Sequence, residues 1–177
     1  MIYTIPDYNR ISSKHYVFTS NGPIVSIVGL DEYWDGRIRI GTDSALEVHE
    51  KYALVLALNS LKEYFRQHGE NTIRPLLRTT ICLIRDDTIS IKAASSHSGP
   101  FIAVTNGMEC SLIVCYLSSW KETRLSIAQM AAVIIEEICH YAYDITDENL
   151  VKKRVIEILQ CSGVSGISFE SIFGISL

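Results

Sequence analysis

Residues 126–144 combine a nearly all-apolar helical pattern with a few ionisable side chains. At helical spacing, Glu136, His140 and Asp144 follow one another at i, i+4 and i+8, with Glu137 beside them. Side chains one turn apart lie on the same face of a helix, where two of them can share a metal ion. Because a helix that is apolar nearly all round is usually buried, we expect its ionisable groups to line a cleft.

The distribution of charge points to the same helix. The chain has 16 Lys and Arg against 20 Asp and Glu, a net charge of −4. Residues 125–151 contain no Lys or Arg and five acidic residues: Glu136, Glu137, Asp144, Asp147 and Glu148. A metal ion or a basic residue of a partner would balance this local charge. The overall acidity excludes a generally basic nucleic-acid binder.

The segment Glu136-Glu137-Ile138-Cys139-His140 resembles the HExxH motif of the zincin metallopeptidases, with Glu in place of the first His. The resemblance implies that His140 is a metal ligand, Glu136 a substitute ligand and Glu137 the general base. Asp144 and Glu157 are the candidates for a third ligand. Zinc or another divalent metal would be the cofactor. Because of the departure from the motif, the resemblance implies a metal-dependent peptide hydrolase activity that is degenerate or lost.

The elements that must position these residues are predicted from periodicity and turn signals. We expect one α+β domain over residues 1–177, with an antiparallel sheet of hairpins packed against one long central helix and two C-terminal helices. The predicted elements are N-terminal hairpins at 1–42, a helix at 44–68, the sheet at 79–117, helices at 126–144 and 147–160, and an apolar tail at 167–177 that forms a last strand or a strip on the core.

Local signals set several of these bounds. Ser44 and Glu47 have the spacing of a capping box, Gly69 is a helix stop, and Asn106-Gly107 is a strong hairpin signal. In the zincins a long helix packs behind a small sheet, an edge strand precedes the motif helix, and a later helix can supply a ligand. The helix at 44–68, the strand at 111–117 and the helix at 147–160 would take these places.

A second function stays open beside the metallopeptidase. The chain could be a non-catalytic regulator or inhibitor, from a mobile element for example, that binds a protein or peptide through its acidic face and apolar C-terminal strip. Ile172, Phe173 and Leu177 in that strip suit a homodimer seam equally well. Five cysteines without a CxxC pair, and the lack of a signal peptide or membrane segment, predict a cytoplasmic protein that binds no membrane.

Overall fold

The structure is a computed structural model that describes residues 2–4, 17–19, 31–35, 37–42, 44–76, 79–85, 103–106 and 112–174. The strands are β1 (Ile2–Thr4), β2 (Val17–Thr19), β3 (Ile38–Thr42), β4 (Thr79–Ile84), β5 (Ala103–Asn106) and β6 (Leu112–Tyr116). The helices are the 3-10 turn η1 (Glu32–Trp34), α1 (Val48–His68), α2 (Leu117–Glu122), α3 (Ile127–Ala142), α4 (Glu148–Gln160) and α5 (Phe169–Phe173). In this described part, no helix has both the length and the apolar character needed to cross a membrane.

The main sheet has the strand order β3-β4-β6-β5, in which β3, β4 and β6 run parallel and β5 is antiparallel to β6. The prediction of an α+β fold with an antiparallel sheet of hairpins is therefore wrong, and the fold is α/β. The physical reason is the connection between β3 and β4, which contains the whole of α1. A crossover helix of this length returns the chain to the same end of the sheet, so that the next strand runs parallel.

One predicted hairpin is confirmed within this sheet. β5 and β6 pair in antiparallel register, with Asn106 opposite Leu112. The strand that the sequence places at the edge, residues 111–117, is however an inner strand, because β6 lies between β4 and β5. The edge strand before α3 is β5. Residues 89–93 of the predicted sheet and residues 24–28 of the predicted N-terminal hairpins lie outside the described residues.

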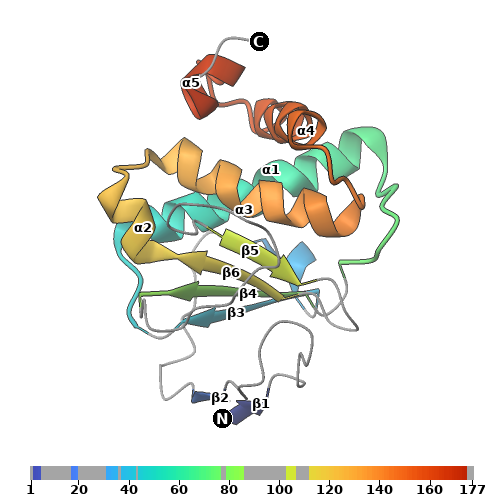
Figure 1. Cartoon of the computed structure of the whole chain (residues 1–177). Coiled ribbons are helices and arrows are strands. Elements are labelled where there is room, and N and C mark those ends of the chain that lie inside the picture. The colour runs from blue at the N-terminus through green and yellow to red at the C-terminus, as the bar shows by residue number, and fades with distance from the viewer. Residues whose placement is uncertain are drawn as a thin grey trace.

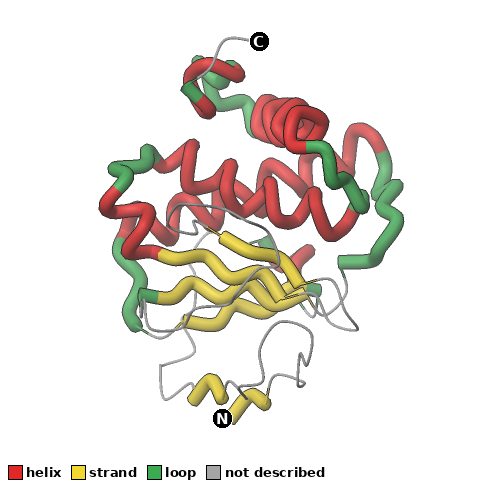
Figure 2. The backbone as a smooth tube through the Cα atoms, viewed as in Figure 1, coloured by secondary structure: helices red, strands yellow, loops and turns green. Residues whose placement is uncertain are grey.

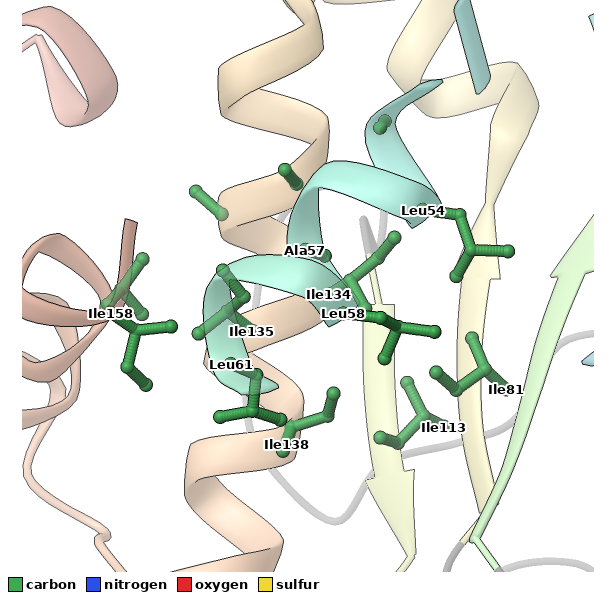
Figure 3. Packing of buried hydrophobic residues seen from close by; sticks show 14 of the residues in the cluster. Leu54, Ala57, Leu58, Leu61, Ile81, Ile113, Ile134, Ile135, Ile138 and Ile158 are labelled. Atoms are coloured by element: carbon green, nitrogen blue, oxygen red, sulfur yellow. The ribbon is translucent and has the colours of Figure 1, made fainter. Parts of the chain in front are cut away.

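The helices form two layers on one face of the sheet, as Figures 1 and 2 show. α1 and α3 lie side by side against the strands, and α4 packs on their outer side. Ile135 of α3 and Leu61 of α1 are fully buried between the sheet and Ile158 of α4 (Figure 3). Burial between the sheet and a second helical layer explains why the sequence of α3 is apolar nearly all round.

Two predicted ends differ from the structure. α1 begins at Val48, because the capping box is formed by Glu47 and Glu50 and not by Ser44 and Glu47. The Glu50 carboxylate accepts from the Glu47 backbone N–H at 2.6 Å and from Arg85 Nη2 at 2.6 Å.

The C-terminal tail also differs. It forms the short helix α5 instead of a strand, since Ser168 caps its first turn and Gly174 ends it in the left-handed conformation at φ 67°. Ile172 of α5 is buried, Phe173 is half-buried, and Leu177 lies outside the described residues.

Candidate metal centre

The candidate site lies where α3 ends and α4 begins. Glu136 and His140 are one turn apart on α3, so helical geometry alone places both side chains on one face. Residues 143–147 then reverse the chain, and Glu148 is the first residue of α4. The Asp147 side chain caps α4 by accepting the backbone N–H groups of Asn149 and Leu150 at 2.9 and 3.0 Å. This cap fixes the start of α4 beside the last turn of α3.

The reversal is held by a distant segment of the chain. Asp144 has a positive φ of 54°, and its carboxylate is paired with Arg74 Nη2 at 2.6 Å. The backbone N–H groups of Ile73 and Arg74 both donate to the Ala142 carbonyl, at 2.8 and 3.0 Å. The connection between α1 and β4 therefore stabilises the turn that brings Glu148 back towards α3.

Glu136, His140 and Glu148 converge on one point. One potential ligand atom from each lies within 4.8 Å of the other two, and His140 Nε2 is 3.8 Å from Glu148 Oε1. Three ligand atoms around a zinc ion at about 2.1 Å would be about 3.4 Å apart in tetrahedral geometry. The side chain of Glu148 is 62% exposed and free to close the remaining distance. The three residues therefore fit a divalent metal after a small side-chain rotation.

The His140 ring is held in the orientation that a ligand needs. Its Nδ1 lies 2.7 Å from the Ile145 carbonyl oxygen. Because a carbonyl oxygen only accepts hydrogen bonds, Nδ1 carries the proton and donates it, and the lone pair of the neutral ring is on Nε2. Nε2 is the atom that points towards Glu148. A backbone carbonyl behind the distal nitrogen is a common support for metal-binding histidines.

Burial and neighbouring negative charges both act on the Glu136 carboxyl. Burial raises the pKa of Glu136 to about 7, and repulsion from Glu137 and Glu148 contributes to the increase. The positive charge of Lys152 and the His140 ring act in the opposite direction and only partly offset it. Binding of a divalent cation between Glu136, His140 and Glu148 would stabilise the ionised form of Glu136.

Glu137 is not one of the three residues that converge, which are Glu136, His140 and Glu148. It is half-buried on α3, about 100° round the helix from Glu136. Burial raises the pKa of the Cys115 thiol in β6, and the negative charge of Glu137 raises it further. Glu137 therefore lies towards the sheet, on the β5–β6 side of α3, while Glu136 interacts with residues of α4.

The two predicted third ligands are engaged elsewhere. Asp144 is paired with Arg74, and Glu157 is paired with Arg154 Nε at 3.0 Å. The structure brings neither of them into the group formed by Glu136, His140 and Glu148. Sequence reasoning counted Glu148 among the local acidic charges and did not consider it as a ligand. The available signal was its place at the first turn of the next helix, directly after a short reversal.

Comparison with protein-family models, with curated protein sequences and with solved structures finds no significant match to this chain.

Proposed function

We propose that this chain is a zincin-like domain that binds a divalent metal through Glu136, His140 and Glu148 and hydrolyses peptide bonds with it. The observation that carries the proposal is the convergence of these three side chains, with His140 Nδ1 bound to a backbone carbonyl. Three protein ligands that leave one side open to solvent are typical of catalytic zinc sites, whereas structural sites are closed by four.

The arrangement of the elements supports the zincin resemblance at two places. The long helix α1 packs behind a small sheet (Figure 3). The following helix α4 supplies the third residue of the group, Glu148. These features concern the order and packing of elements and therefore do not depend on the identity of the first residue of the motif.

Each residue has a distinct role in the proposed reaction. A bound zinc ion would polarise the scissile carbonyl and lower the pKa of a water molecule. Glu136, His140 and Glu148 would hold the ion, and the Ile145 carbonyl orients the His140 ring through Nδ1. Glu137, the residue next to Glu136 on α3, would be the general base that takes up a proton from water and gives it to the leaving amine.

The proposal is tested by metal content and activity on the same samples. Protein purified without chelator should contain about one zinc or other divalent ion per chain, and it should cleave peptides from a mixed library. His140→Ala should lose both the metal and the activity. Glu137→Gln should keep the metal and lose activity by orders of magnitude, while Glu122→Gln, at an exposed position on α2, should change neither. Metal content near zero, with no change in melting temperature on addition of zinc, would refute the proposal.

A further inference from the structure

Lys152 lies on the face of α4 that carries Glu148. It follows Glu148 by four residues, which is one helical turn. The side chain is half-buried, and its positive charge acts on Glu136 of the facing helix. Lys153, its neighbour in the sequence, is exposed on another face of α4. Lys152 therefore shares a helix face with Glu148, and the exposed Lys153 is a natural control.

The helix α5 fixes the position of the Lys152 side chain. Lys152 Nζ lies 5.6 Å from the centre of the Phe173 ring, within the range of a cation–π contact. α5 is in turn attached to α3, where Gln129 Nε2 donates to the Ile172 carbonyl at 3.1 Å. Gln129 precedes Glu136 by two helical turns on α3. The ammonium group thus lies against α5, on the face of α4 that carries Glu148.

We propose that Lys152 is a built-in counter-cation of the Glu136–His140–Glu148 group and competes with the metal for it. This inference rests on the proposed function, because it concerns the affinity of the same site. In the metal-free protein the ammonium balances part of the negative charge of the two carboxylates. When a metal binds, the ammonium is repelled and retains its contact with Phe173. Lys152 therefore lowers the affinity of the site for the metal.

The charge of Lys152 should change the zinc affinity of the site by a measurable amount. A unit charge one helical turn from a bound divalent ion changes the binding constant by about tenfold at the dielectric of a half-exposed site. Lys152→Met removes the charge and keeps the apolar stem that packs near Phe173. Lys152→Arg keeps the charge. Lys153→Met removes the same charge at the exposed neighbouring position.

The test is a zinc titration by calorimetry on the full chain after removal of metal by chelator and dialysis. Lys152→Met should bind zinc about tenfold more tightly than the unaltered chain, while Lys152→Arg and Lys153→Met stay within about twofold. Metal-free Lys152→Met should also melt at a lower temperature than metal-free Lys153→Met, because it has lost the counter-charge. If Lys152→Met binds zinc no more tightly than Lys153→Met, the competition is refuted while the metal site stands. If none of the four proteins binds zinc, the proposed function itself is refuted, and this inference with it.

Discussion

Substitution of Glu136 by Gln should stabilise the metal-free protein at neutral and alkaline pH. The pKa of Glu136 is raised from 4.5 to about 7 in the folded chain, chiefly by burial. Between pH 4.5 and about pH 7, Glu136 in the folded chain holds a proton that it has released in the unfolded chain. The stability of the unaltered protein therefore falls as pH rises through this window, and the loss is complete above about pH 7.

The magnitude follows from the size of the shift. One pKa unit corresponds to about 1.4 kcal/mol, so the full shift is worth about 3 kcal/mol of unfolding free energy. Because solvent reaches part of the Glu136 side chain, a gain of about 1–3 kcal/mol is expected for Glu136→Gln at pH 8. Below pH 4.5 the carboxyl is neutral in both states and the gain should vanish. Gln retains the shape of the side chain and removes its charge.

The assay is urea unfolding in the presence of chelator at pH 5, 6, 7 and 8. The stability difference between Glu136→Gln and the unaltered chain should grow across this series. Glu122→Gln, an exposed substitution of the same kind, should give a small and constant difference. The reasoning is refuted if Glu136→Gln is less stable than the unaltered chain at pH 8, or if its advantage is the same at pH 5 and pH 8.

Added zinc should reverse the order of stability at pH 8. A ligand present at about 1,000 times its dissociation constant stabilises the folded state by about 4.1 kcal/mol, more than the expected advantage of Glu136→Gln. The unaltered chain should gain this amount, and Glu136→Gln, which lacks an ionised ligand at this position, should gain little. A residue that lowers the stability of the empty protein and raises that of the loaded one is placed for function and not for folding.

Three further substitutions test other parts of the structure. Glu136→His completes the HExxH motif and should bind zinc at least about tenfold more tightly in the same calorimetric titration, because imidazole suits zinc better than carboxylate. Unchanged or weaker zinc binding would contradict the assignment of residue 136 as a ligand. Arg85→Ala should lower the unfolding free energy by about 3 kcal/mol in urea, since it leaves the buried Glu50 carboxylate without its 2.6 Å ion pair. Ile135→Ala should cost about 2–5 kcal/mol in the same assay, because the side chain is fully buried between two helical layers; a loss below 1 kcal/mol would argue against that packing.

The parts of the fold that depend on local periodicity could be predicted from the sequence. α1, α3 and α4 lie within the predicted helices at 44–68, 126–144 and 147–160, since apolar spacing reports directly on helical faces. The directions of the strands could not be read in the same way. Turn signals such as Asn106-Gly107 mark one real hairpin, but β3 and β4 are joined through α1, and their parallel pairing depends on how that helix packs.

The candidate site divides in the same way. Glu136 and His140 come together because the i, i+4 spacing is fixed by the helix itself. Glu148 joins them only because Asp144 adopts a positive φ and is held by Arg74, a residue 70 positions earlier in the chain. That ion pair also withdraws Asp144 from the site. Tertiary contacts of this range leave no periodic trace in a single sequence.

The central claim is that Glu136, His140 and Glu148 hold one divalent metal ion. The most direct test is a crystal of the zinc-loaded chain measured on both sides of the zinc absorption edge. We predict one anomalous peak between the three side chains, with His140 Nε2 and one carboxylate oxygen each of Glu136 and Glu148 at about 2.0–2.2 Å. No peak at this position, or a peak on other residues while His140 Nε2 contacts only protein or water, would contradict the claim.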